Sequence, residues 1–362
     1  MRPQVAAYVY PGWHACPERD RWFPPGWSEW DLVLNGKPLF PGHEQPRLPL
    51  DGPYDDSRPE TAARQTALAR RYGVDLFVYG LFWSRGKRVF ERALDVGFLG
   101  GAGDGFPFAV MWANRMPRRV LPVKRATGSL IHPHRLVHTD PEDFLALVRF
   151  AAERYFARPN YFRIEGCPLF AVFDSTFFVR QMGPAVAREA ILGARRLLRD
   201  CAQPGLHLMA LNPAPGLLGA LAEIGFDSAA HYVYLPEWKG DYLQDYATLT
   251  LRRTGEWDGL RRQAAIPYFP SVSPGWDATP RGSMHAGRPA RRYPWWPIVV
   301  GSTPQLFRNF LESAILFSRE HNPAPLVFAA SWNEWSEGHY LEPDRRHGSG
   351  WLEAVRDAHD IG

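Results

Sequence analysis

The sequence has little of what a disulfide scaffold, a zinc site or a membrane span would need. Its 362 residues include three cysteines, Cys16, Cys167 and Cys201, which are far apart and show no Cys-x-x-Cys or Cys/His spacing. An odd number of isolated cysteines is typical of reduced thiols in an intracellular protein. No apolar run approaches the roughly 18 residues of a membrane span, and no signal-peptide stretch precedes the strand-like segment 4–10. We therefore expect a cytoplasmic protein without a membrane span.

An excess of charge of one sign is also missing. The 42 Lys and Arg residues and the 38 Asp and Glu residues are mixed along the chain, and the formal net charge of +4 is small for this length. Nucleic acid is therefore not an expected partner. Gly100, Gly101 and Gly103 do not follow an expected strand and lack Gly-x-Gly-x-x-Gly spacing, so a dinucleotide site is not indicated. Three histidines between positions 132 and 138 have no nearby carboxylate or cysteine, and we expect no metal.

Aromatic residues, in contrast, are plentiful: they make up 14% of the chain and include 14 Trp. A large aromatic core accounts for part of them. The others fit a carbohydrate-binding cleft, in which flat rings cover the apolar faces of sugars. Trp22, Trp27 and Trp30 suit either use, since they lie in a long segment rich in Pro and Trp, residues 11–58. A loop of that length inside a compact domain is usually functional.

Eight short apolar runs, bounded by Gly, Pro or polar residues, are mostly separated by stretches of helical periodicity. Apolar runs without alternation are typical of parallel strands covered by helices. Eight such units predict an α/β fold, a (β/α)8 TIM barrel, built as a single domain over residues 1–362 with long βα loops. The expected strands are Val5–Tyr10, Val74–Trp83, Phe106–Trp112, Pro168–Phe173, Leu206–Leu211, Phe226–Tyr234, Ile266–Val272 and Leu326–Trp332. The expected helices are Pro59–Tyr72, Pro141–Phe156, Gly183–Cys201, Leu217–Ile224, Tyr242–Gln263, Pro304–His321 and Trp351–Ala358. The second connection, Arg92–Gly100, is short and Gly-rich.

In such a barrel the reactive residues lie at the carboxyl ends of the strands and in the loops that follow. These positions carry polar and aromatic side chains here. Any one of them is more often structural than functional, but their coincidence over most strands indicates a substrate site on one rim. The predicted substrate-binding residues are Tyr10, His14, Trp83, Trp112, Asn114, Tyr232, Trp276, Asp277, Trp332, Asn333 and Trp335.

Glu334 and Glu337 give the sharpest local signal. They lie three residues apart in the segment SWNEWSEG, residues 331–338, directly after the last expected strand. If the chain turns helical there, positions i and i+3 share one face. Cleavage of a glycosidic bond needs one carboxyl group that protonates the leaving oxygen and a second that acts as base or nucleophile. A structural alternative is that both glutamates cap a helix start or pair with Arg345 and Arg346.

The sequence resembles the glycoside hydrolase family 99-like group, which includes the WbsX-like proteins, over nearly the whole chain. Three long segments make the resemblance specific: WFPPGWSEW at 22–30, KPLFPGHEQPRLPL at 37–50 and SWNEWSEGHYLEPD at 331–344. Shorter segments add to it, namely YGVDLFVYGLFW at 72–83, WAN at 112–114 and PGWDATPR at 274–281. The resemblance implies a (β/α)8 barrel that acts on carbohydrate.

The resemblance also implies roles for the two catalytic glutamates. Glu334 would deprotonate the 2-hydroxyl of the sugar, which displaces the leaving group and forms a 1,2-anhydro intermediate. Glu337 would protonate the leaving oxygen and later activate water, with net retention. Attack by the 2-hydroxyl limits the substrate to α-manno- or α-rhamno-configured linkages in an oligosaccharide or polysaccharide. As the acid, Glu337 would need a more apolar or more crowded site than Glu334. Carboxylates and water suffice for this chemistry, so we expect no cofactor.

The sequence departs from the family pattern at the expected rim, where YVYPGWH at 8–14 and RMPRR at 115–119 replace the usual segments. Two other functions therefore stay open. One is a WbsX-like glycosyltransferase or transglycosylase in cell-surface polysaccharide biosynthesis, and the other is a non-catalytic glycan-binding barrel. The basic segment Arg115–His138 is either an anionic subsite or a solvated loop. The sugar, the linkage and the oligomeric state are not indicated.

Overall fold

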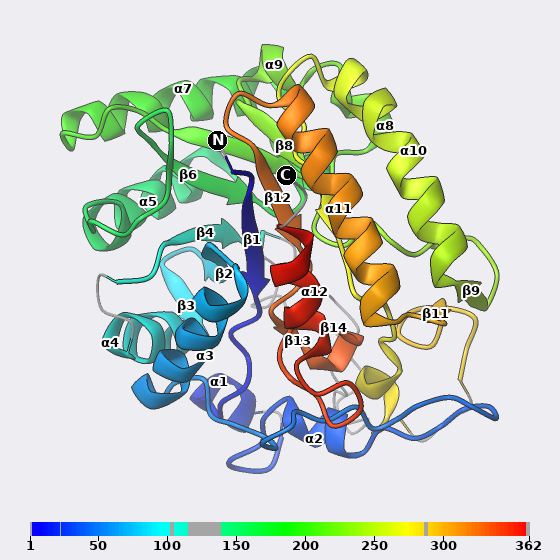
Figure 1. Cartoon of the computed structure of the whole chain (residues 1–362). Helices are drawn as coiled ribbons and strands as arrows, with labels where there is room; N and C mark the ends of the chain where they lie inside the picture. The colour runs from blue at the N-terminus through cyan, green and yellow to red at the C-terminus, as the bar shows by residue number, and fades with distance from the viewer. Residues whose placement is uncertain (1, 22, 102–104, 115–138, 286–288, 360–362) are drawn as a thin grey trace.

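A ring of parallel strands lies at the centre of the molecule. The computed structural model describes residues 2–21, 23–101, 105–114, 139–285 and 289–359 (Figure 1). Eight strands pair in parallel in the order β10-β12-β1-β2-β4-β6-β7-β8. A parallel bridge between Ala229 and Tyr268 joins the two ends of this series, so the sheet forms a barrel and the predicted fold class is confirmed. The strands are β1 (Gln4–Val9), β2 (Leu76–Ser84), β4 (Phe108–Trp112), β6 (Cys167–Val172), β7 (His207–Leu211), β8 (Ser228–Ala230), β10 (Ser271–Val272) and β12 (Leu326–Ala329).

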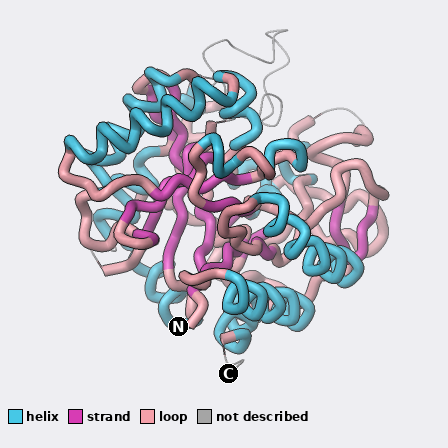
Figure 2. Tube along the Cα trace, turned by 90° about the horizontal axis from the view of Figure 1, so that it is seen from above, coloured by secondary structure: helices cyan, strands magenta, loops and turns pink. Residues whose placement is uncertain are grey.

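Helices surround the strands, which Figure 2 shows as a central magenta group inside cyan coils. The helix ends follow local signals: Pro occupies the first turn of α3, α5, α7 and α11, and an Asp or Thr side chain caps α5, α10 and α11. The expected helices at 59–72 and 304–321 are present with the predicted bounds. The main helices are α3 (Pro59–Tyr72), α5 (Pro141–Ala151), α7 (Pro184–Asp200), α10 (Tyr246–Ala264), α11 (Pro304–His321) and α12 (Gly350–Ala358).

The seventh strand is shorter than predicted. The expected run Ile266–Val272 is reduced to the two residues of β10, because Pro267 and Pro270 have no N–H to donate to a neighbouring strand. The prediction of a helix at 242–263 was wrong at its start. Residues Leu243–Asp245 form a strand, β9, which pairs in parallel with β11 (Ile298–Val300).

Other connections also differ from the expected ones. The expected helix 217–224 is divided into α8 (Pro215–Leu218) and α9 (Leu221–Ile224), and an unpredicted helix, α6 (Ser175–Met182), precedes α7. The expected helix 141–156 ends in a π-helical turn, η4 (Ala152–Phe156). Residues 93–101 form a second π-helical turn, η1 (Ala93–Phe98), followed by α4 (Leu99–Gly101). Two short strands, β3 (Lys87–Val89) and β5 (Arg163–Ile164), pair antiparallel with β2 and β6.

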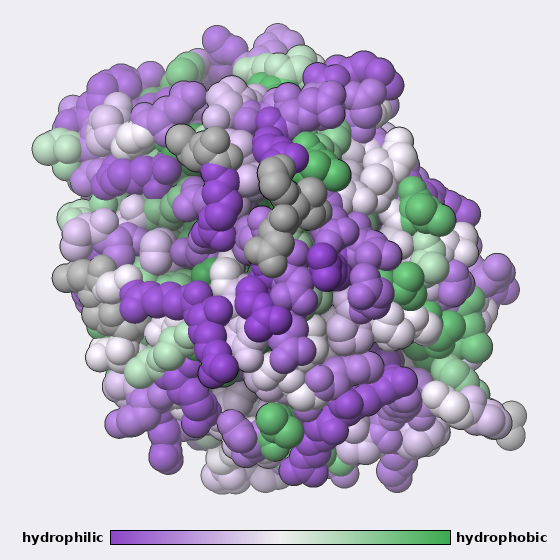
Figure 3. Space-filling view, viewed as in Figure 1, coloured by the Kyte–Doolittle hydropathy of each residue, from purple (hydrophilic) through white to green (hydrophobic). Residues whose placement is uncertain are grey.

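The long segment after β1 lies against the carboxyl ends of the strands. In Figure 1, β1 points toward the end of the barrel at which α1 (Pro17–Asp20), α2 (Trp30–Leu34), β13 (Asn333–Glu334) and β14 (His339–Tyr340) gather. The outer face seen in the same view is mainly hydrophilic, with small apolar patches (Figure 3). Among the described residues, no helix combines the length and the apolar character that a bilayer crossing needs.

Phe328 tests the importance of barrel packing for stability. Its fully buried ring stacks on Tyr8 of the first strand and meets Phe269, which precedes β10. We expect Phe328→Ala to lower the free energy of unfolding by about 3–5 kcal/mol, because it leaves a cavity between these strands. Leu251, which is 77% exposed on α10, provides the control, and Leu251→Ala should change stability by less than about 0.5 kcal/mol. Urea unfolding of both variants measures the contrast, and equal losses would contradict this packing.

Candidate active site

The two glutamates of the SWNEWSEG segment lie on a tight hairpin beyond β12. The backbone N–H of Trp332 donates to the carbonyl of Tyr8 at 2.7 Å, which continues the pairing of this segment with β1. Asn333 and Glu334 then pair antiparallel with Tyr340 and His339. Instead of the expected helix, a single 3-10 turn, η6 (Trp335–Glu337), joins the two strands and ends at Gly338, whose φ is 68°. This hairpin places the carboxyl groups of Glu334 and Glu337 on the same side, where one partner can reach both.

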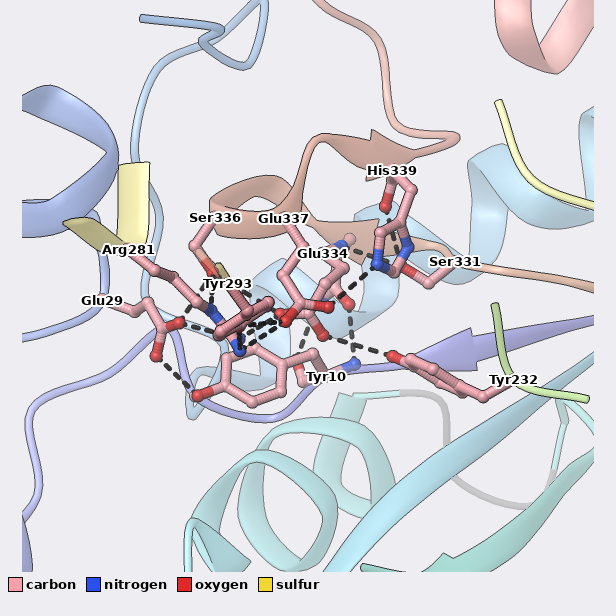
Figure 4. Close-up of polar contacts among 12 residues, drawn as sticks. Tyr10, Glu29, Tyr232, Arg281, Tyr293, Ser331, Glu334, Ser336, Glu337 and His339 are labelled. Carbon is pink, nitrogen blue, oxygen red and sulfur yellow. Dashed lines mark hydrogen bonds and ion pairs between the residues drawn. The ribbon is translucent and has the colours of Figure 1, made fainter. Parts of the chain in front are cut away.

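A single guanidinium joins the two carboxylates (Figure 4). Arg281, on the 3-10 turn η5 (Thr279–Gly282), donates from Nη1 to Oε1 of Glu337 at 2.6 Å and from Nη2 to Oε1 of Glu334 at 2.6 Å. Its Nη2 also lies 3.0 Å from Oε1 of Glu29, a residue of the long segment after β1. Three carboxylates therefore surround one cation, and all four side chains are buried.

Glu29 is held by further donors. Its Oε2 accepts from Nη2 of Arg19 at 2.6 Å and from the hydroxyl of Tyr10 at 2.6 Å. Its Oε1 accepts at 2.7 Å from Oγ of Ser336, which lies between Glu334 and Glu337 in the sequence. Two arginines face this carboxylate, so the pKa of Glu29 is lowered although burial opposes the shift. The network fixes α2 and the hairpin relative to each other.

The pKa values of the two glutamates shift in opposite directions. Burial raises the pKa of Glu334 well above its ordinary value, and the charges of Glu337 and Glu29 add to this effect against the opposing pull of Arg281. For Glu337, burial acts in the same direction but is outweighed by Arg281, His339 and Tyr293, which hold its pKa at about 2. Tyr293 donates to Oε1 of Glu337 at 2.5 Å, and Nε2 of His339 lies 3.2 Å from its Oε2. In the free protein the pKa order is therefore opposite to the one that an acid role for Glu337 would need, because donors from distant segments converge on this residue.

Several predicted substrate-binding residues lie next to this pair. The Tyr232 hydroxyl donates to Oε2 of Glu334 at 3.2 Å, and the ring of Trp276 stacks on His339 with centroids 5.5 Å apart. Asn333 exchanges hydrogen bonds with the backbone of Tyr10, at 2.8 and 3.0 Å.

Other predicted residues lie beneath the rim or hold its loops. Trp112, Asn114 and Trp332 are fully buried, so in this structure they offer no surface to a ligand. Asn114 bonds both the N–H and the carbonyl of Asp174, at 2.7 and 2.9 Å. The remaining four predicted residues make structural contacts: Trp83 Nε1 donates to Asp143, His14 Nδ1 bonds Asp56, Asp277 accepts from His43 and Gln45, and Trp335 stacks on Tyr340. The basic segment 115–138, with its three histidines, and Trp22 lie outside the described residues.

Most of the charged partners of Glu334 and Glu337 were not among the residues predicted from the sequence. Glu29, Arg281 and His339 all lie inside segments that carry the family resemblance, which was the available signal. Nothing local marks them as partners, because Arg281 reaches Glu334 and Glu337 across 53 and 56 positions of sequence.

One group of possible metal ligands occurs in the described part of the chain. Single ligand atoms of His14, Asp55 and Asp56 lie within 4.8 Å of one another. Nδ1 of His14 and Oδ1 of Asp56 are 2.6 Å apart, which is a hydrogen-bond distance with no room for an ion between them. Asp56 also accepts from the backbone N–H of Trp13 at 3.1 Å. The contacts of Asp56 with Trp13 and His14 therefore hold the start of the loop after β1 in place.

The comparisons with known proteins point to one family. A family model described as "Glycosyltransferase WbsX" matches residues 5–355. Proteins named "Uncharacterized protein WxcX" from two strains of Xanthomonas campestris pv. campestris are 30% identical over 373 residues, which cover 98% of this chain and 49% of each relative. The chain therefore spans about half the length of the curated relatives it matches.

Solved structures resemble the fold. The GH99 endo-alpha-mannosidase from Bacteroides thetaiotaomicron gives a TM-score of 0.63 at 15% identity and covers 99% of this chain and 96% of that one. A structure named "Glycoside hydrolase-like protein" gives a TM-score of 0.62 at 15% identity, over 100% of this chain and 95% of the other. At this level of identity the likeness is one of fold, and it supports the barrel.

Glu342 gives this site a testable pH dependence. Its buried carboxyl group accepts from Tyr54, Trp335 and Gln65 at 2.6 to 2.8 Å, yet burial raises its pKa from 4.5 to about 7. The folded protein then binds more protons than the unfolded chain between about pH 4.5 and 7, so this group's contribution to stability falls as pH rises through that window. In Glu342→Gln this loss disappears. Relative to wild type, the variant should therefore gain about 3 kcal/mol of unfolding free energy between pH 5 and pH 8.

Urea unfolding at the two pH values measures this gain. Glu353→Gln, at an exposed position on α12, is the matched control and should show no such gain. A difference between Glu342→Gln and wild type that stays constant with pH would show that Glu342 is ionised in the folded protein.

Proposed function

The chain belongs to the glycosyltransferase WbsX family, and we propose that it is a retaining glycoside hydrolase that cleaves α-manno- or α-rhamno-configured linkages in an oligosaccharide or polysaccharide. The observation that carries this proposal is the catalytic pair: two buried carboxyl groups bonded to one guanidinium, with pKa values that shift apart. Two carboxyl groups that differ in protonation are what acid and base catalysis at a glycosidic bond require. The barrel, which resembles a GH99 endo-alpha-mannosidase, supports the same class of reaction.

The proposed reaction moves one proton through each carboxyl group. The charged glutamate takes the proton of the sugar's 2-hydroxyl, whose oxygen attacks C1 and forms a 1,2-anhydro ring. The bond from C1 to the leaving oxygen breaks, and that oxygen receives the proton of the neutral glutamate. Water then opens the ring at C1 and gives one proton to the glutamate that had lost its proton to the leaving oxygen. The other glutamate returns to O2 the proton that it took from the 2-hydroxyl. Two inversions at C1 give net retention, as in substrate-assisted exceptions to the nucleophile scheme.

The electrostatics of the free protein favour one division of the two roles. The raised pKa of Glu334 favours its protonated form, and the lowered pKa of Glu337 favours its charged form. We therefore assign Glu334 as the acid and Glu337 as the base, which is the reverse of the roles that the resemblance implies. Tyr232 and Tyr293 are the positioning residues of this scheme, since each donates to one of the two carboxyl groups. No cofactor enters these steps.

A glycosyltransferase or transglycosylase is the second candidate, because the family's description favours it. The same pair would serve a transglycosylase if an acceptor hydroxyl, instead of water, opened the intermediate. A non-catalytic glycan-binding barrel would have no need of two buried, oppositely shifted carboxyl groups.

A screen of α-mannans and rhamnose-containing polysaccharides with reducing-end detection tests the activity. We expect new reducing ends from at least one α-manno or α-rhamno substrate and none from α-glucans, in which O2 is not anti to the leaving group. Addition of a mannoside acceptor separates the two candidates, since a transglycosylase would form longer products without a matching gain of reducing ends. Reducing ends from α-glucans would contradict 2-hydroxyl participation.

The two glutamine variants test the roles. Glu337→Gln should lower kcat/KM by about 10²- to 10⁴-fold on natural glycans and on an activated aryl glycoside alike, because the base is needed for both. Glu334→Gln should lose a similar factor on natural glycans but retain much more activity on the aryl glycoside, whose leaving group needs no proton. Glu353→Gln on α12 is the control for a surface glutamate. The opposite pattern would restore the roles that the resemblance implies, and equal losses on both substrates would indicate another scheme.

A further inference from the structure

A pocket opens on the barrel rim beside the catalytic pair. It holds about 510 Å³ and lies between two loops that follow strands, residues 231–242 after β8 and residues 289–297 of the connection after β10. Its wall combines three aromatic and three cationic side chains, namely Trp238, Tyr293, Trp296, Lys239, Arg291 and Arg292. None of these residues was among those predicted from the strand ends, because they lie deep within the loops.

The aromatic side chains form a fixed frame. Trp296 donates from Nε1 to the carbonyl of Gly240 at 3.1 Å, which joins the two loops. Trp238 is 54% exposed, although its ring meets the edge of Trp276 with centroids 4.9 Å apart. A half-exposed Trp that is held in place offers a flat apolar surface, as the carbon-rich face of a sugar ring requires.

The cationic side chains give the pocket a positive charge. Lys239, Arg291 and Arg292 are exposed, and within the described part of the chain no carboxylate lies within ion-pair distance of them. The nearby Glu237 does not neutralise them, since Arg252 and Arg253 bind its carboxylate. Arg291 lies over the ring of Trp296 at 4.5 Å from its centroid, which orients the guanidinium. A planar guanidinium matches the oxygens of a carboxylate or a phosphate.

Tyr293 connects the wall of the pocket to the catalytic pair. This residue lines the pocket and also donates to Glu337 at 2.5 Å. Trp276 lies between Trp238 and Tyr293, with its ring centroid 6.3 Å from that of Tyr293. A ligand in the pocket would therefore be a direct neighbour of the sugar whose bond is cleaved.

We propose that this pocket is a subsite for an anionic sugar residue, one that carries a carboxylate or a phosphate and stacks on Trp238 while Arg291 and Arg292 bind its anion. The inference rests on the proposed function and deepens it, because it makes the substrate of the catalytic pair an acidic glycan. Sugar oligomers with uncharged residues would fill the same space but would leave the three cations unused.

Equilibrium binding by titration calorimetry tests the subsite in a Glu334→Gln background, which slows turnover of natural glycans. The probes are neutral α-manno-oligosaccharides, the same oligosaccharides phosphorylated at the 6-position, and oligosaccharides that contain a uronic acid. We expect the phosphate or the uronate to improve affinity, and the ratio of anionic to neutral affinity to fall at least about tenfold in Arg291→Gln/Arg292→Gln. Comparison of the phosphorylated with the uronate-containing oligosaccharides shows whether the pocket prefers a phosphate or a carboxylate.

Two further variants control the result. Arg196→Gln/Arg199→Gln removes the same charge from exposed positions on α7 and should leave the ratio unchanged. Trp238→Ala should weaken neutral and anionic ligands together, because it removes the stacking surface and keeps the cations. Equal affinity for neutral and anionic probes, or a ratio that survives the loss of Arg291 and Arg292, would overturn the proposal.

The outcome for the subsite is separate from the outcome for the reaction. Cleavage of neutral α-mannosides by wild type, with no preference for anionic ones, would reject the subsite and leave the hydrolase proposal standing. Binding of anionic probes that depends on Arg291 and Arg292, without cleavage of any glycan, would support the subsite and reject the hydrolase. Binding of GDP or UDP through the same arginines, in competition with the glycans, would assign the pocket to the diphosphate of a sugar donor and overturn the proposal.

Discussion

The guanidinium of Arg281 lies among three buried carboxylates, and the architecture of the rim depends on how it shares its donors. Burial of several charges is costly unless each one is paired and hydrogen-bonded. Arg281 meets this condition because its planar group presents donors in fixed directions, to Glu337 from Nη1, to Glu334 and Glu29 from Nη2, and to Ser336 from Nε. One side chain from the loop after β10 thereby joins the loops after β1 and β12.

The same interaction contributes to the opposite pKa shifts of Glu334 and Glu337. Burial raises the pKa of Glu334, and Glu29, which shares Nη2 of Arg281 with it, adds to this rise. Glu337 has Nη1 on one oxygen together with Tyr293, and His339 near the other, so its charge is compensated. The long segment after β1 supplies Glu29, and it is therefore part of the electrostatics of the site as well as part of its wall.

The barrel could be predicted from the sequence because local patterns of residues specify its strands and helices. Each strand is a run of buried residues bounded by Gly, Pro or polar positions, and Pro marks the first turn of several helices. The prediction failed where a proline inside an apolar run shortened the seventh strand, and where a pattern that fits a helix at 242–245 became a strand by pairing with β11. That Glu334 and Glu337 lie together at the rim was predictable from their spacing. Their pKa order was not, because it depends on Arg281, Tyr293 and Glu29, which no local pattern connects to them.

The proposed chemistry leaves the choice between a hydrolase and a transferase to the rim. The carboxyl groups of Glu334 and Glu337 are 3% and 9% exposed, so little water reaches them in the free protein, and in the proposed reaction the species that opens the intermediate would be the one that the rim admits. The chemistry at C1 is the same for water and for a sugar hydroxyl. The difference must then come from how firmly the rim holds the sugar next to the cleaved bond: tight binding by Trp238 and the neighbouring arginines would keep an acceptor hydroxyl in place, whereas release of that sugar would let water in. In the proposed reaction the loops of the rim would therefore decide between water and an acceptor sugar, and Glu334 and Glu337 would serve both.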